Sequence, residues 1–129
     1  LLAGDLLRAG LRFDESYFLY CEDADLCEQA RARGGSVWLT RAASAVHVGG
    51  GSQPGEAVLG ELTASRLYWL TRAKALFARR WLGPVQRACF LAVALVAKPL
   101  VGLALARSPR FLAPYWRGLR DGLMTPLRR

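Results

Sequence analysis

Cysteine and histidine are scarce in this 129-residue sequence, which argues against a disulfide-stabilised protein and against a zinc site. The three cysteines, Cys21, Cys27 and Cys89, are an odd set without the spacing of a disulfide framework or a zinc site. We therefore expect reduced thiols in a cytoplasmic setting. Disorder is excluded as well, because 53% of the residues are hydrophobic, enough for the core of one domain.

Acidic residues are almost absent from the second half. Residues 62–129 hold one acid, Asp121, against thirteen bases, a net charge of +12, whereas residues 1–61 hold nine acids and five bases, a net charge of −4. The basic, apolar half suits an anionic surface such as lipid headgroups, and the acidic half suits proton or metal chemistry. Nucleic acid is not an expected partner, because the arginines alternate with a long apolar run and no recognition motif is present.

We do not expect Leu1 to Gly4 to be part of a signal peptide, because the given sequence shows no basic residues in front of them. The sequence opens on Leu1 rather than Met, so we expect a piece of a longer protein.

The residue pattern predicts a mixture of helices and strands before residue 82. Gly10 and Gly34-Gly35 are typical helix stops, and Gly49–Gly55 has the composition of a loop. The expected helices are Gly4–Gly10, Asp23–Arg33 and Glu56–Trp81, and the expected strands or extended segments are Ser16–Tyr20, Ser36–Thr40 and Ala43–Val48.

Five carboxylates lie within the twelve residues from Asp14 to Asp25, and the last three (Glu22, Asp23, Asp25) open a predicted helix. Free backbone N–H groups and the helix dipole keep a carboxylate ionised at that position. Such a group suits a general base. Acids at a helix start are also ordinary caps, and on these features alone both interpretations stand.

Four segments follow one another in a recognisable order: Phe13-Asp14-Glu15, Phe18-Leu19-Tyr20-Cys21-Glu22-Asp23-Ala24-Asp25-Leu26-Cys27, Arg31 to Gly34, and Val46-His47-Val48-Gly49-Gly50-Gly51-Ser52. These motifs resemble those of family 2 glycosyltransferases, above all bacterial rhamnosyltransferase-like members. The resemblance covers about residues 4–75 and keeps order and spacing, although Leu11-Arg12 replaces the usual Gly before Phe13, and Val48 replaces a second His or similar residue.

This resemblance implies an α/β fold. Residues 1–82 would be the C-terminal part of a GT-A catalytic domain, and residues 83–129 an α-helical, membrane-associating extension. Members of the family transfer a sugar from a nucleotide-diphosphate donor and invert the configuration at its anomeric carbon. Asp23, paired with Glu22, matches their catalytic base. Asp25 matches an acid that is acceptor-orienting or structural. The family's metal-binding D-x-D lies upstream, so Asp23-Ala24-Asp25 is not expected to be that motif.

For the donor, the resemblance implies Mg²⁺ or Mn²⁺ bound by His47 together with a D-x-D motif absent from this sequence. His47 is equally open to interpretation as a packed side chain. The glycine-rich loop with Gly50, Gly51 and Ser52 suits a diphosphate or a hinge. Arg66, and more weakly Arg72 and Lys74, suit the same phosphates or a solvated helix face.

Ala88–Ala106 is a nineteen-residue apolar run with one charge, Lys98. Nine strong hydrophobes contribute about −4 kcal/mol to insertion, and a central lysine costs roughly +3 kcal/mol. A membrane span, a helix lying in the membrane interface and a helix packed on the domain therefore all remain open. The following stretch predicts an amphipathic membrane-surface helix. Its basic side is Arg107, Arg110, Arg117 and Arg120, and its apolar side is Phe111, Leu112, Tyr115, Trp116, Leu119 and Leu123.

The sequence thus predicts part of an inverting glycosyltransferase for a cell-envelope or polyprenyl-linked glycan. Its expected location is the cytoplasmic face of the bacterial plasma membrane, held by anionic lipid, and the 129 residues alone are expected to be inactive. The alternative is a non-catalytic membrane-binding or interaction module that retains a transferase remnant.

Overall fold

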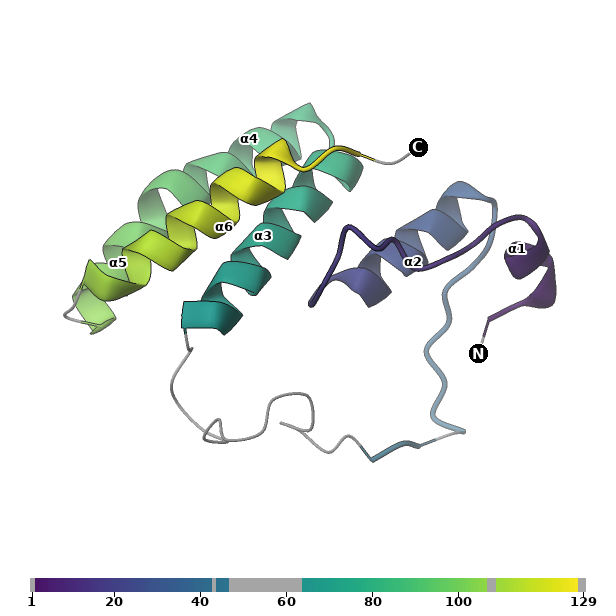
Figure 1. Cartoon of the computed structure of the whole chain (residues 1–129). Coiled ribbons are helices and arrows are strands. Elements are labelled where there is room, and N and C mark those ends of the chain that lie inside the picture. The colour runs from purple at the N-terminus through teal and green to yellow at the C-terminus, as the bar shows by residue number, and fades with distance from the viewer. Residues whose placement is uncertain (1, 43, 47–63, 107–108, 128–129) are drawn as a thin grey trace.

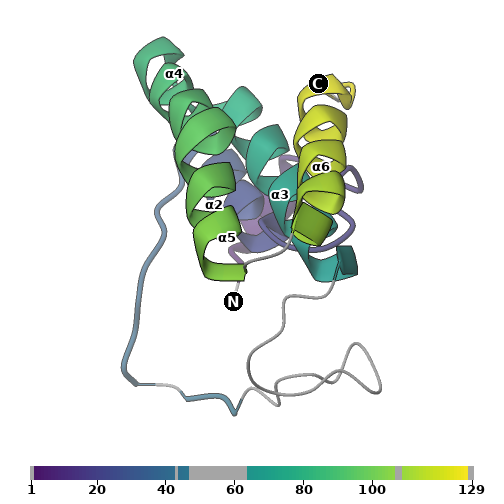
Figure 2. The ribbon, with the colours of Figure 1, turned by 90° about the vertical axis from the view of Figure 1, so that its left-hand side faces the viewer.

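The computed structural model describes residues 2–42, 44–46, 64–106 and 109–127. Within these ranges every regular element is a helix. The elements are α1 (Gly4–Arg8), α2 (Glu22–Ala32), α3 (Ala64–Trp81), α4 (Pro84–Ala92), the π-helix η1 (Val93–Ala97), α5 (Lys98–Ala106), the 3₁₀ turn η2 (Pro109–Phe111) and α6 (Leu112–Met124). Figures 1 and 2 show α3, α6 and the long α4–η1–α5 helix side by side as a bundle, with α1 and α2 beyond α3.

The expected α/β fold, the C-terminal part of a GT-A domain, is wrong for the described residues, which contain no strand. Ser16–Tyr20 forms turns and bends instead of a strand. Ser36–Thr40 has no regular structure, and its Trp38 and Leu39 are 86% and 96% exposed. A strand needs a neighbouring strand to pair with, and the part of the chain that the structure describes contains none.

The predicted helices before residue 82 occur, with small shifts of their ends. α1 stops at a glycine in the left-handed region, Gly10 with φ +83°, and α2 is followed by Gly34 with φ +78°. Both glycines adopt a conformation that side chains disfavour, which is why they end helices. α3 covers the second part of the predicted Glu56–Trp81 helix, and residues 56–63 lie outside the described ranges.

The closest helix pair is α3 with α6, and two glycines of α6 make this approach possible. A Cβ at Gly118 would meet the carbonyl oxygen of Tyr68, and a Cβ at Gly122 would lie 2.7 Å from the Cβ of Ala75. Small residues four apart let two helix backbones approach closely. α3, before the expected boundary at residue 82, therefore packs along α6, which lies after it.

Gly83 and Pro84 separate α3 from the apolar helix, as the sequence predicts. The Gly83 N–H donates to the Gln86 side-chain oxygen at 3.1 Å, and Pro84 occupies the first helical position, where its missing N–H costs nothing. The helix then runs through α4, η1 and α5 over the predicted Ala88–Ala106 run. By length and composition its residues Pro84–Ala104 suffice to cross a membrane.

The amphipathic stretch after it forms η2 and α6, with Pro114 in the first turn of α6, where proline is tolerated. Most of its predicted apolar side packs in the bundle, whereas Trp116 is 38% exposed. Tyr115 and Leu119 are 5% and 3% exposed and pack with Ala75 and Ala94. Arg107, one of the four predicted basic residues, lies outside the described ranges.

Candidate functional site

The loop between α1 and α2 carries the acidic and aromatic cluster, and two buried side chains fix its path. Leu11 packs against Leu26 in α2, and Tyr17 packs against Ala73 and Leu76 in α3. Burial of these anchors places a segment without regular secondary structure against two helices. The loop therefore approaches the start of α2 along a defined route.

Asp14 ties the same loop to the C-terminal part of α3. Its Oδ1 accepts the Ser16 N–H at 2.8 Å, and its carboxylate forms an ion pair with Arg80. Burial alone would raise the pKa of Asp14, but the Ser16 hydrogen bonds and the Arg80 guanidinium outweigh it, so this pKa lies below its ordinary value. Asp14 is a structural carboxylate rather than a free acid.

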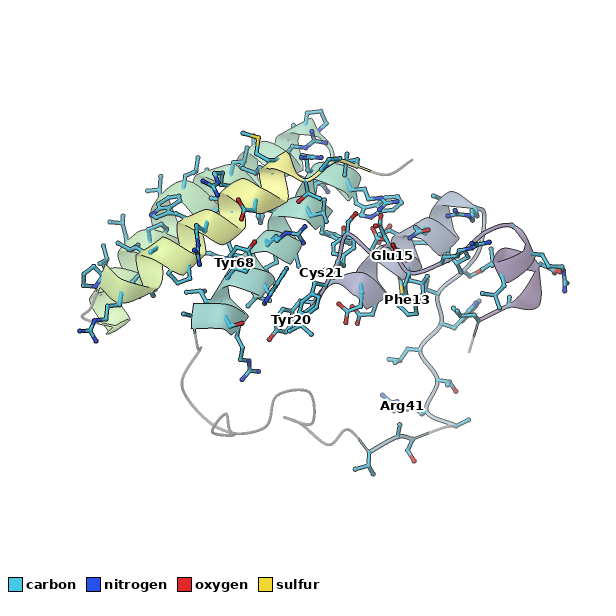
Figure 3. All side chains as sticks on the ribbon, in the orientation of Figure 1. Phe13, Glu15, Tyr20, Cys21, Arg41 and Tyr68 are labelled. Atoms are coloured by element: carbon cyan, nitrogen blue, oxygen red, sulfur yellow. The ribbon has the colours of Figure 1, made fainter. Side chains whose placement is uncertain are left out.

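Two consecutive residues before α2 adopt the left-handed backbone region, Tyr20 with φ 69° and Cys21 with φ 61°. Side chains other than glycine, asparagine and aspartate rarely adopt it, and each such residue stores roughly 1–3 kcal/mol of strain. Figure 3 shows both residues between α3 and the start of α2. Tyr20 and Cys21 pack beside Tyr17 and Leu76, so tertiary contacts hold the turn that directs Glu22 into α2.

Asp25 lies at the centre of a buried polar network. Its side chain is fully buried and accepts hydrogen bonds from Gln29 Nε2 and from Trp81 Nε1, each at 2.7 Å. The Arg80 guanidinium lies 3.4 Å from Asp25 Oδ1. Burial, and to a smaller extent the negative charge of Asp25, raise the pKa of the Tyr17 hydroxyl above its ordinary value. The network attaches α2 to the end of α3, and Asp25 is out of reach of a substrate.

Asp23, two residues before Asp25 in the same helix, is exposed. One of its carboxylate oxygens accepts a hydrogen bond from the Ala24 N–H at 2.7 Å. Asp23 is thus held at the first turn of α2 while it remains exposed to solvent. Glu22 is half-buried, and its Oε2 atom is buried without a hydrogen-bond partner among the described residues. The predicted pair thus opens α2 as expected, with Asp23 as its accessible member.

An aromatic surface lies on the loop and the first turns of α3. The ring of Phe18, 69% exposed, packs on Trp69 with centroids 4.5 Å apart and the ring planes tilted by 36°. The Arg72 guanidinium lies 5.5 Å from the centroid of the Trp69 ring. The Arg66 Nε donates to the Tyr20 hydroxyl at 3.3 Å. Sequence reasoning missed this surface, because Phe18 and Trp69 are 51 residues apart in the chain.

Most of the predicted donor site falls outside the described ranges, namely His47, Gly50, Gly51 and Ser52. Arg66 lies within the described ranges, beside the loop that precedes α2. In the described part of the chain no three His, Cys, Asp or Glu side chains gather as metal ligands. Cys21, Cys27 and Cys89 are free thiols, and burial raises the pKa of the Cys21 thiol.

The chain matches no protein-family model, no curated protein and no solved structure. The geometry of the loop and α2 therefore carries the functional argument. An open cleft of about 330 Å³ also lies beside Asp14, lined in part by Arg12, Arg33 and Arg80. Glu22 and Asp23 do not line it, so it is a different surface from the candidate site.

Proposed function

We propose that this chain takes part in an inverting sugar transfer, with Asp23 as the general base. The observation that carries the proposal is an exposed carboxylate at the start of an eleven-residue helix whose position is held by the buried Asp25 network. Asp23 lies in the first turn of α2, beside the free backbone N–H groups at the start of the helix. Asp23 takes the acceptor hydroxyl proton while that oxygen bonds to the anomeric carbon, and the nucleoside diphosphate leaves from the opposite side.

The neighbouring aromatic surface supports a sugar as the acceptor. A pyranose ring presents C–H groups on one face, which pack well on an aromatic ring, while its hydroxyls need polar partners. Phe18 and Trp69 offer such rings, and the Tyr20 hydroxyl and Arg72 lie beside them. The acceptor we propose is a cell-envelope or polyprenyl-linked glycan.

The donor is proposed to be a nucleotide-diphosphate sugar. Arg66, held near the loop by Tyr20, would reach its phosphates, together with Gly50, Gly51 and Ser52. Mg²⁺ or Mn²⁺ would be bound by His47 and by residues absent from this sequence, and it would stabilise the diphosphate as it leaves. The described residues do not assemble a ligand set for this ion, so the proposed proton transfer rests on Asp23 alone.

The apolar Pro84–Ala104 helix supports membrane association. We place the protein on the cytoplasmic face of a bacterial plasma membrane. The same helix also favours a second candidate function, a membrane-binding module that keeps the loop and α2 as a remnant without catalysis.

Transfer kinetics of Asp23→Asn in the full-length protein test the proposal. Release of nucleoside diphosphate from a panel of nucleotide-diphosphate sugars is followed with a lipid-linked glycan as acceptor. We expect a fall in kcat of roughly 10²–10⁴-fold, with donor binding unchanged. Glu28→Gln, on the same helix, is the matched control and keeps its rate. An Asp23→Asn rate above about a tenth of the original contradicts the base assignment, and unchanged lipid binding with no transfer in either protein favours the module.

A further inference from the structure

The long helix formed by α4, η1 and α5 presents an apolar face to solvent. Between Arg87 and Lys98 it carries no charged residue. The face consists of large side chains that are 38% to 61% exposed, Val93, Leu95, Val96, Leu100, Val101 and Leu103. A continuous exposed apolar surface of this kind marks an interaction or membrane site.

The opposite face of this helix belongs to the bundle. Ala94 is 2% exposed, and its carbonyl oxygen accepts a hydrogen bond from the Tyr115 hydroxyl at 2.6 Å. The Phe111 ring packs on Gly102 so closely that a Cβ there would lie 2.5 Å from it. The helix therefore has one face committed to α3 and α6 and one face free of them.

The π-helix η1 keeps the buried and the exposed faces of the long helix in line between α4 and α5. The buried residues Ala94 and Pro99 are five positions apart, which is the hydrogen-bond step of a π-helix, whereas an α-helix would bring Lys98 to the buried side. Lys98 is exposed as a result. The extra residue thus removes the one charge of the run from the bundle core.

The partners of this helix carry charges that oppose entry into hydrocarbon. α3 contains Arg72, Arg79 and Arg80, and α6 contains Arg117 and Arg120. Each arginine at the bilayer centre is strongly unfavourable. A transmembrane α4–η1–α5 helix would either draw these residues inward or leave the bundle and expose Ala94 and Tyr115.

We propose that the bundle stays intact and docks on one leaflet of an anionic bilayer, with the exposed face of α4–η1–α5 lying in the plane of the membrane. The occupant is lipid rather than a second copy of the chain, because residues 62–129 carry a net charge of +12. Two such surfaces repel each other, whereas an anionic leaflet attracts them. The exposed Lys98 side chain reaches the headgroups while its stem stays in the apolar layer.

Co-sedimentation with vesicles tests the surface. The 129-residue chain is mixed with vesicles of phosphatidylcholine containing phosphatidylglycerol, and with phosphatidylcholine alone. The double variant Val96→Asp/Leu100→Asp should lower the partition coefficient at least tenfold. The matched control is Leu39→Asp/Val46→Asp, which adds the same charges at two residues 96% and 93% exposed in the acidic half, and it should bind as the original chain does. Equal effects of the two variants overturn the proposal.

Accessibility of the two helix ends separates docking from spanning. Single cysteines at Val85→Cys or Ala104→Cys, in a chain whose native cysteines are alanine, carry a fluorophore that external dithionite quenches. Docking on one leaflet predicts equal quenching of both labels from outside the vesicle. Protection of one label means a span and overturns the proposal.

Sedimentation velocity without lipid tests whether a second copy of the chain binds the apolar face instead of lipid. We expect a monomer at micromolar concentration, and a dimer abolished by Val96→Asp/Leu100→Asp assigns the face to a second copy instead. These measurements need no sugar transfer. Inactivity of the protein therefore leaves the docking result intact, and failure to dock leaves the Asp23 assignment intact.

Discussion

Replacing Asp25 by alanine should destabilise the fold strongly. The change removes the acceptor of the Gln29 and Trp81 hydrogen bonds and one of the two carboxylates beside Arg80. Breaking a buried charge pair from one side costs about 3–5 kcal/mol, because the partner remains buried. Asp14 still pairs with Arg80, so we expect the lower end of that range, about 3 kcal/mol.

Urea unfolding, followed by far-UV circular dichroism and by tryptophan fluorescence, measures this loss. Trp81 donates to Asp25 directly, so its emission reports on the network. Glu28→Ala is the matched control on α2, because Glu28 pairs with Arg31 at the surface and its loss should cost under about 1 kcal/mol. Asp25→Asn keeps the side-chain shape and one acceptor oxygen, and it should fall between the two.

The result also decides between the two roles that the sequence leaves open for Asp25. A structural carboxylate loses stability first and activity only as a consequence, whereas an acceptor-orienting one loses activity in a stable fold. If Asp25→Ala is no less stable than Glu28→Ala, the buried network does not hold α2, and the reasoning fails.

Three further outcomes follow from the contacts. Gly122→Ala should cost roughly 1–3 kcal/mol in urea unfolding, because its Cβ would push α6 off Ala75, while Gly4→Ala, which meets only the flexible Arg8 side chain, should not destabilise. Cys21→Val should lose about 1–2 kcal/mol, because a β-branched residue fits φ 61° poorly, and Cys27→Val inside α2 should lose less. Because the pKa of Asp14 is lowered on folding, its contribution to stability is present above the unfolded value near 3.8 and disappears as pH falls through the folded value, so Asp14→Asn should flatten the acid side of a stability–pH profile.

Local signals explain which elements the sequence could predict. Gly10 and Gly34 follow the C-terminal caps of α1 and α2, and Gly83-Pro84 separates α3 from α4, so short-range chemistry decides each boundary. Strands were predicted wrongly because an aromatic or apolar run cannot show whether a pairing neighbour exists. Tyr17 shows the difference, since its burial against α3 explains the aromatic segment without a sheet.

Contacts between residues far apart in the chain explain what the sequence could not predict. The sequence assigns the apolar side of α6 to a membrane surface, but the structure buries its Tyr115 and Leu119 in the bundle. The spacing of Gly118 and Gly122 could have indicated the close packing of α6 on α3. Nothing local to Asp14 signals Arg80, which lies 66 residues later. The position of Asp23 at the start of α2 was predictable because it depends on local sequence alone, whereas Trp69 beside Phe18 depends on the whole fold.

Arginines inside the bundle change how the basic half should be understood. Arg72 donates to the Ser16 carbonyl at 2.7 Å and to the Thr125 hydroxyl at 3.1 Å, so one side chain links the loop before α2 to the end of α6. Arg79 bonds the Leu123 and Thr125 carbonyls, and its neighbour Arg80 turns to the Asp14 and Asp25 carboxylates. These guanidiniums hold the fold together, so the charge that reaches lipid is smaller than +12. Because α3 carries all three, a bundle docked on a bilayer would also fix the orientation of the loop that leads to Asp23.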